Sequence, residues 1–152
     1  MNDKEQFIAW INDNIVDISE SARERLLQFA DMVLVCSDRM GMLARGDLPR
    51  LYLRHLRAAF APPLTAATPV GAKVRDVGSG GGFPGIPLAI LRNDIEITLL
   101  EPRHRRAAFL ERAVLVLGLG EVKVHTASMD AFSLQPGGQR FDWVVSRGVA
   151  WT

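Results

Sequence analysis

Five glycines between residues 78 and 85 lie close in sequence to two carboxylates, and residues of these types could bind a small ligand together. The stretch reads DVGSGGGFPG from Asp76 to Gly85, and Glu101 follows the next apolar segment, 23 residues after Gly78. Glycine is favoured where the backbone bends sharply or passes close to another group, so the run predicts a loop against a ligand. The N–H groups of a helix that follows such a loop attract an anionic part of the ligand.

The loop and the two carboxylates favour S-adenosyl-L-methionine over a dinucleotide. A carboxylate at the end of the second strand can bind both ribose hydroxyls of an adenosine-type cofactor, and the amino acid end of S-adenosyl-L-methionine needs a cation partner and an anion partner. A dinucleotide site, G-x-G-x-x-G, would have its third glycine where Phe83 stands, and two prolines delay the helix. We predict a cofactor site built from Asp76, Gly78, Ser79, Gly80, Gly82 and Glu101. A glycine loop that only forms a tight turn is the alternative.

Short apolar segments that alternate with helical patterns must position this loop. The pattern predicts strands at residues 73–77, 95–101, 121–127 and 141–147, and helices at 85–92 and 103–117. Strands that alternate with helices indicate an α/β fold with a parallel, Rossmann-like sheet, which binds ligands beyond the carboxyl ends of its strands.

The first part of the chain has helical patterns only. Helices are expected over residues 5–13, from a cap at Ser19 or Ser21 onward, and over residues 49–60, before the proline-containing linker PPLTAATPVG. We therefore predict two parts, an N-terminal helical region at 1–65 and a Rossmann-like core at 71–152.

Composition narrows the class of protein. A hydrophobic share of 48% and a charged share of 23% over 152 residues are typical of a soluble domain, and no apolar run is long enough to span a membrane. One cysteine, Cys36, excludes an internal disulfide and cannot build a zinc site, so a cytoplasmic protein with no metal is expected. The net charge is −4 over residues 1–31 and +5 over residues 32–152, and a clustered basic face would suit a polyanion partner.

Three segments of the sequence resemble one enzyme family. They are DVGSGGGFPGIPLAI, LLEPRHRRAAFLERAV and FDWVVSRGVA, and the element FPGIPL is the most specific. They resemble the ribosomal RNA small subunit methyltransferase G family, also called glucose-inhibited division protein B, which methylates guanine N7 in 16S ribosomal RNA. The resemblance implies the class I S-adenosyl-L-methionine-dependent methyltransferase fold and ribosomal RNA of the small subunit as partner. By position, it places further cofactor contacts on Phe83, Met129, Asp130 and Arg147.

The sequence departs from the family pattern at four places. Ser128 stands where the family has arginine, Gly41-Met42-Leu43 replaces an Asn-Leu-Thr element, and Ala58-Ala59 replaces Asp-Ser. The chain also stops soon after Ser146, whereas family members continue for some tens of residues. We therefore expect a truncated sheet whose fourth strand is an exposed edge, and a marginally stable chain that dimerises through this edge or aggregates and transfers no methyl group. A same-fold methyltransferase with another acceptor and a non-catalytic cofactor- or RNA-binding module are the alternatives.

No catalytic residue is predicted, and the acceptor chemistry explains why. The Asn/Asp-Pro-Pro turn of amino-group methyltransferases is absent after the fourth strand, and Cys36 lies in an apolar helix unsuited to a nucleophile. Guanine N7 presents a lone pair and loses no proton, so positioning alone can drive the transfer. For RNA contact the candidates are Arg54, His55, Arg103, Arg105 and Arg106. A solvated basic face and a structural histidine are the alternatives.

Overall fold

Four parallel strands form the sheet of this protein. The structure is a computed structural model, and it describes all residues except 16, 42, 44, 61–67, 134–139 and 147–152. The strands are β1 (Lys73–Val77), β2 (Glu96–Leu100), β3 (Lys123–His125) and β4 (Trp143–Ser146). Their order, β3-β2-β1-β4, confirms the Rossmann-like sheet with the first strand inside it.

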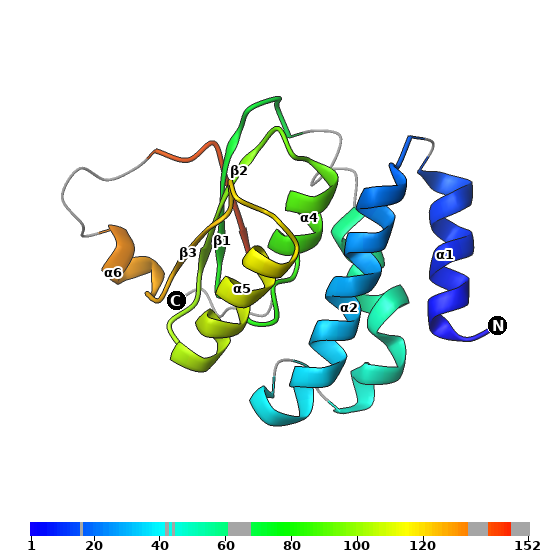
Figure 1. Cartoon of the computed structure of the whole chain (residues 1–152). Coiled ribbons are helices and arrows are strands. Elements are labelled where there is room, and N and C mark those ends of the chain that lie inside the picture. The colour runs from blue at the N-terminus through cyan, green and yellow to red at the C-terminus, as the bar shows by residue number, and fades with distance from the viewer. Residues whose placement is uncertain (16, 42, 44, 61–67, 134–139, 147–152) are drawn as a thin grey trace.

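Helices cover the two faces of the sheet unequally (Figure 1). The N-terminal helices are α1 (Asp3–Asn14) and α2 (Glu20–Met40), and the core helices are α4 (Gly85–Leu91), α5 (His104–Val116) and α6 (Met129–Ser133). Of the two predicted caps, Ser19 is the one that caps α2: its Oγ accepts the N–H of Ala22 at 3.0 Å. Helices α2, α4 and α5 lie on one side of the sheet, and α6 lies on the other. None of the described helices is long and apolar enough to cross a lipid bilayer.

The helix predicted over residues 49–60 is present, but it is not a regular α-helix. The chain instead forms a 3₁₀ helix η1 (Arg45–Arg50), a π-helical segment η2 (Leu51–Leu56) and a second 3₁₀ helix η3 (Arg57–Phe60). Pro49 has no N–H to donate. The N–H groups of Tyr52 and Leu53 donate to the carboxylate of Asp3, at 2.7 and 3.2 Å.

One hydrophobic cluster joins the N-terminal helices to the sheet. Phe7 and Phe29 from the N-terminal helices, Ile86 from α4 and Leu99 from β2 all belong to it, and each is fully buried. Such a shared core holds the helical region and the sheet in one arrangement, because separating them would expose these side chains to water. The boundary predicted between residues 65 and 71 lies partly in the segment 61–67, which is outside the described residues.

A buried arginine lies on the opposite face of the sheet. Arg75 of β1 is 9% exposed, and its guanidinium lies 4.9 Å from the ring centre of Phe132 and 4.1 Å from that of Phe141. The two aromatic rings stabilise the cation where water is scarce. Burial lowers the pKa of Arg75 below its ordinary value.

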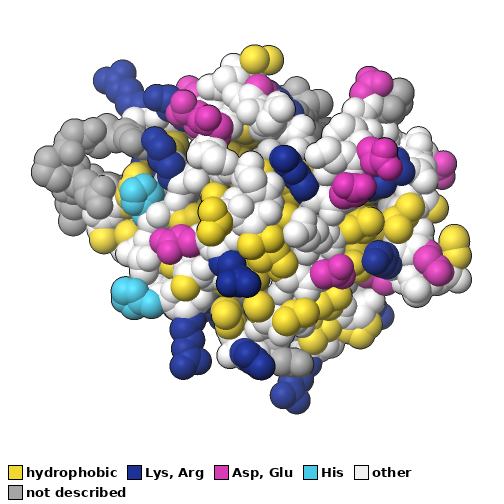
Figure 2. Space-filling view, in the orientation of Figure 1, with side chains coloured by type: hydrophobic (Ala, Val, Ile, Leu, Met, Phe, Trp, Pro, Cys, Tyr) yellow, Lys and Arg dark blue, Asp and Glu magenta, His cyan; other side chains and the backbone are white. Residues whose placement is uncertain are grey.

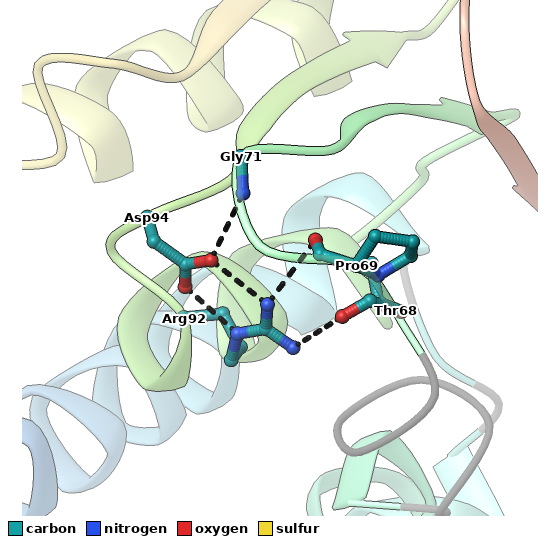
Figure 3. Close-up of polar contacts among 5 residues, drawn as sticks. All are labelled: Thr68, Pro69, Gly71, Arg92 and Asp94. Carbon is teal, nitrogen blue, oxygen red and sulfur yellow. Dashed lines mark hydrogen bonds and ion pairs between the residues drawn. The ribbon is translucent and has the colours of Figure 1, made fainter.

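An ion pair fixes the edge of the sheet at which β1 and β2 begin (Figure 3). Arg92 donates to both carboxylate oxygens of Asp94, at 2.7 and 2.8 Å, and to the carbonyl oxygens of Thr68 and Pro69. Asp94 also accepts the N–H of Gly71 at 3.2 Å. The hydrogen bond from Arg92 lowers the pKa of Asp94 to about 2. These bonds hold the turn before β1 against the connection from α4 to β2.

Candidate active site

The strand register brings the predicted cofactor residues to one edge of the sheet. Val77 pairs with both Leu100 and Ser146, and Leu100 pairs with His125, so the last residues of all four strands form one row. The glycine loop follows Val77, Glu101 follows Leu100, and α6 begins four residues after His125. Three of the four predicted segments therefore meet at this edge. Arg147, which follows Ser146, lies outside the described residues.

The glycine loop turns back over the end of β2. The N–H groups of Gly78 and Ser79 both donate to the carbonyl of Leu100, at 2.9 and 3.0 Å. Ser79 Oγ donates to the carbonyl of Asp76 at 3.0 Å. The φ angles of Gly78 and Gly80 are +67° and +54°, a backbone region that other residues rarely adopt. The glycines are thus required by the shape of the loop.

Gly80 and Gly82 face different surroundings. A Cβ built on Gly80 would meet only the carbonyl oxygen of Gly78, at 3.9 Å, among the described atoms. A Cβ built on Gly82 would lie 2.7 Å from Ile86 Cγ1 and 3.1 Å from Phe29 Cζ. Gly80 therefore leaves open space where a ligand can approach the backbone, whereas Gly82 lets the loop pack tightly on the core.

Glu101 lies beside the open side of the loop. Its Oε2 accepts the N–H of Gly80 at 3.3 Å, and its own N–H donates to the carbonyl of His125 at 3.1 Å. The residue is 3% exposed. A carboxylate held at this point has the hydrogen-bonding capacity that a ribose diol requires. The left-handed glycines, the open space at Gly80 and this carboxylate fit the adenosine part of S-adenosyl-L-methionine.

Asp76 lies under the loop, where it supports the start of α4. Its Oδ2 accepts the N–H of Gly85 at 3.0 Å, and its Oδ1 is buried with no hydrogen-bond partner among the described residues. Burial raises the pKa of Asp76 to about 8; the nearby charge of Glu101 adds to the rise, and the bond from Gly85 opposes it. Asp76 thus carries a proton at neutral pH and positions the loop from below.

The raised pKa makes stability depend on pH. The folded chain keeps the proton on Asp76 while the unfolded chain loses it above about pH 4, so the free energy of unfolding should fall as the pH rises from 4 to 8. We expect Asp76→Asn to abolish most of this fall, and Asp17→Asn, at an exposed position, to leave it unchanged. Urea unfolding at pH 5 and pH 8 measures the fall in the free energy of unfolding. A fall of the same size in Asp76→Asn would contradict the raised pKa of Asp76.

Phe83 and His55 form one contact between the loop and the N-terminal helices. The Phe83 ring is 5% exposed and lies 5.2 Å from the ring of Phe29 and 5.7 Å from that of His55. His55 is 7% exposed, so this RNA candidate lies against the loop and largely out of contact with solvent. Met129 and Asp130 begin α6 at the same edge of the sheet, and Asp130 is exposed.

The basic candidates divide into exposed and anchored side chains. Arg103 and Arg105 are exposed at the start of α5, whereas Arg106 donates to the carbonyl of Gly41 at 2.9 Å. Gly41 ends α2 with φ +59°, and a cation at a helix C-terminus is favourable. Figure 2 shows Lys and Arg side chains along the lower edge of the molecule, where Figure 1 places the start of α5 and the end of α2.

Sequence reasoning missed two residues that support this site. Phe29 packs against Phe83, and Asp47 forms an ion pair with Arg54 at 2.9 Å and lies 3.5 Å from His55 Nε2. Asp47 lies in the first turn of η1. No local signal distinguishes Phe29 from the other apolar residues on the buried face of α2.

A parallel sheet in this order, a glycine loop with left-handed residues and an acid after β2 define a class I S-adenosyl-L-methionine-dependent methyltransferase. Two solved structures share the fold. One is a Plasmodium falciparum protein described as a protein-L-isoaspartate O-methyltransferase, in complex with S-adenosyl-L-homocysteine, at TM-score 0.53 and 16% identity over 96% of this chain and 73% of that one. The other is coclaurine N-methyltransferase, at TM-score 0.54 and 10% identity over 95% of this chain and 49% of that one.

Within that class, the chain belongs to the GidB family, rRNA small subunit methyltransferase G, whose model matches residues 22–152. It is 37% identical to the ribosomal RNA small subunit methyltransferase G of Neisseria meningitidis, over 99% of this chain and 70% of the relative. It is 43% identical to the protein of the same name from Streptomyces coelicolor, over 64% of this chain and 40% of the relative. The resemblance drawn from the sequence motifs is confirmed.

Proposed function

We propose that this protein transfers the methyl group of S-adenosyl-L-methionine to N7 of a guanine in 16S ribosomal RNA, in the cytoplasm where ribosomes assemble. One observation carries the proposal: in a chain of this family, the glycine loop and Glu101 meet at one edge of the sheet. Exposed arginines at the start of α5 lie at the same edge. The loop suits the cofactor and the arginines suit a polyanion.

The cofactor is held by backbone and carboxylate groups in this proposal. Gly78 and Gly80 let the chain approach it closely, and Glu101 accepts hydrogen bonds from the ribose. Met129 and Asp130 bound the same edge, and the family resemblance adds Phe83 and Arg147. When bound, S-adenosyl-L-methionine supplies an electrophilic methyl group on a sulfonium.

The chain's own contribution to the transfer is positioning. Guanine N7 attacks with a lone pair and releases no proton, so no side chain has to act as a base. Asp76, the carboxyl group with the raised pKa at this edge, is fully buried beneath the loop and donates nothing to an acceptor. The loop positions the cofactor and the basic surface positions the RNA, so that the lone pair of guanine N7 lies in line with the methyl group.

A methyl-transfer assay on small ribosomal subunits that lack the modification tests this proposal. Tritiated methyl groups should appear on guanine N7, and Glu101→Ala should weaken S-adenosyl-L-methionine binding by about 1–3 kcal/mol, because a hydrogen-bonded charged group is lost. Transfer to a different acceptor would contradict the guanine assignment. Cofactor binding unaffected by Glu101→Ala would contradict the role of this carboxylate.

RNA affinity should fall steeply with salt, and two arginines should account for part of the slope. Each phosphate contact adds about 0.7–0.9 to the slope of log affinity against log salt. We expect replacement of Arg103 and Arg105 by glutamine to flatten the slope by about 1.5 while cofactor affinity is retained. Arg106 is kept, because it anchors Gly41.

Arg112→Gln is the matched control for this experiment. Arg112 is exposed on the same helix, about two turns beyond Arg105 and farther from the edge where the strands end. Its replacement should leave the slope unchanged. A salt-insensitive interaction with small subunits, or equal slopes in both variants, would contradict the basic surface on α5.

We also propose that the outer edge of β4 pairs with a second copy of the chain. Among the described strands, β4 pairs only with β1, and Trp143 and Val144 on it are 38% and 45% exposed. Exposed strand edges are templates for association. Sedimentation should show concentration-dependent dimers that Val144→Lys weakens, and a monomer at all concentrations would contradict this.

A further inference from the structure

Four residues connect the surface of the N-terminal helices to the cofactor loop. Asp47 Oδ1 lies 2.9 Å from Arg54 Nη1, and Asp47 Oδ2 lies 3.5 Å from His55 Nε2. The ring of His55 lies 5.7 Å from that of Phe83. The connection therefore runs from a guanidinium through a carboxylate and an imidazole to the loop that carries Gly80.

The outer end of this connection is exposed and the inner end is buried. The side chain of Arg54 is 56% exposed, that of Asp47 is 22% exposed and that of His55 is 8% exposed. Phe83 packs against Phe29 of α2 as well, so the end of the loop is held between two N-terminal elements. A change in the partner of Arg54 can thus reach the loop through groups in direct contact.

A cavity of about 550 Å³ lies beside Arg54. It is lined by Asp3, Gln6, Pro49, Arg50, Leu53 and Arg54. Two guanidinium groups can bind a phosphate through paired hydrogen bonds, and the apolar residues offer a wall for a sugar or base. The carboxylate of Asp3 is already bonded to the N–H groups of Tyr52 and Leu53, so it opposes an anion less than a free carboxylate would. This combination suits a segment of RNA backbone.

We propose, on the basis of the proposed function, that a ribosomal RNA phosphate bound at Arg54 couples substrate binding to cofactor binding through Asp47, His55 and Phe83. An exposed ion pair is weak, and a phosphate matches a guanidinium well, so the phosphate displaces Asp47 from Arg54. The carboxylate of Asp47 then interacts with His55 without sharing its charge with Arg54. This strengthens their contact, holds the His55 ring against Phe83 and orders the loop for the cofactor.

Binding of S-adenosyl-L-homocysteine, with and without saturating small ribosomal subunits that lack the modification, tests the coupling without turnover. In the unaltered protein the subunits should tighten binding of S-adenosyl-L-homocysteine about fivefold, and this ligand should tighten subunit binding by the same factor. Asp47→Asn keeps the shape of the side chain and removes its charge. We expect both ligands to bind this variant separately, with a coupling factor of about 1.

Arg105→Gln provides the control for RNA affinity. This variant should bind subunits more weakly and keep the fivefold factor at saturation, because Arg105 lies outside the connection. If Asp47 has only a structural role, Asp47→Asn would weaken binding of S-adenosyl-L-homocysteine equally with and without subunits. The coupling factor would then stay at about five, which would overturn the coupling and leave the proposed function in place. Absence of subunit binding or of S-adenosyl-L-homocysteine binding by the unaltered protein would overturn the proposed function and the coupling with it.

Discussion

Replacement of Gly80 by valine should weaken S-adenosyl-L-methionine binding at least about 100-fold, equivalent to about 2.7 kcal/mol. Gly80 has φ +54°, and the space that a side chain would enter holds only the carbonyl oxygen of Gly78, 3.9 Å away, among the described atoms. A β-branched side chain would fill this space and strain the backbone. It would also displace the N–H that donates to Glu101. Calorimetry measures the loss.

Gly118→Val separates backbone strain from ligand contact. Gly118 has φ +67°, and the nearest atom to its built Cβ is Arg25 Nη2 at 3.8 Å, so strain and surroundings match those of Gly80. It lies beyond the far end of α5, a helix about 20 Å long that leads away from the site. Both variants should lose similar stability, and only Gly80→Val should lose cofactor affinity. Equal affinity in both would place the cofactor elsewhere.

Replacement of Gly85 by alanine should lower the free energy of unfolding by about 3 kcal/mol, because the added methyl group overpacks the core. Gly85 is the first residue of α4, where helix propensity does not disfavour alanine. A built Cβ would overlap Leu99 Cδ2 and lie 2.6 Å from Asp76 Oδ2. Both neighbours are fully buried, so the added atom would force a shift within the packed core. The methyl group would also disturb the hydrogen bond from Gly85 to Asp76.

Gly46→Ala is the control for helix propensity. Gly46 lies in η1, and no described atom comes within 4 Å of its built Cβ. This variant should be as stable as the unaltered protein or slightly more so in urea unfolding. If Gly85→Ala were equally stable, the contact between α4 and β2 would be looser than the structure indicates.

The sequence predicted the elements whose signals are local. Strand β1 was expected over residues 73–77 and is found at Lys73–Val77, because its apolar run is bounded by turn residues. The cap at Ser19 depends on a bond to Ala22, three residues away. The position of Glu101 beside the loop also followed from sequence alone, because parallel strands end at a common edge and the acid directly follows one of them.

Only the tertiary structure decided how the remaining residues are used, since their partners lie far away in sequence. The carboxylate of Asp3 accepts the N–H of Tyr52, 49 residues later, and no local pattern reports this bond. His55 and Gly82 are predicted ligand contacts, and their packing could not be read from the sequence. The ring of His55 lies against that of Phe83, and a Cβ on Gly82 would meet Ile86 and Phe29. Sequence spacing determines which residues reach the edge of the sheet. Packing around each side chain determines whether it faces a ligand, a neighbouring helix or the core.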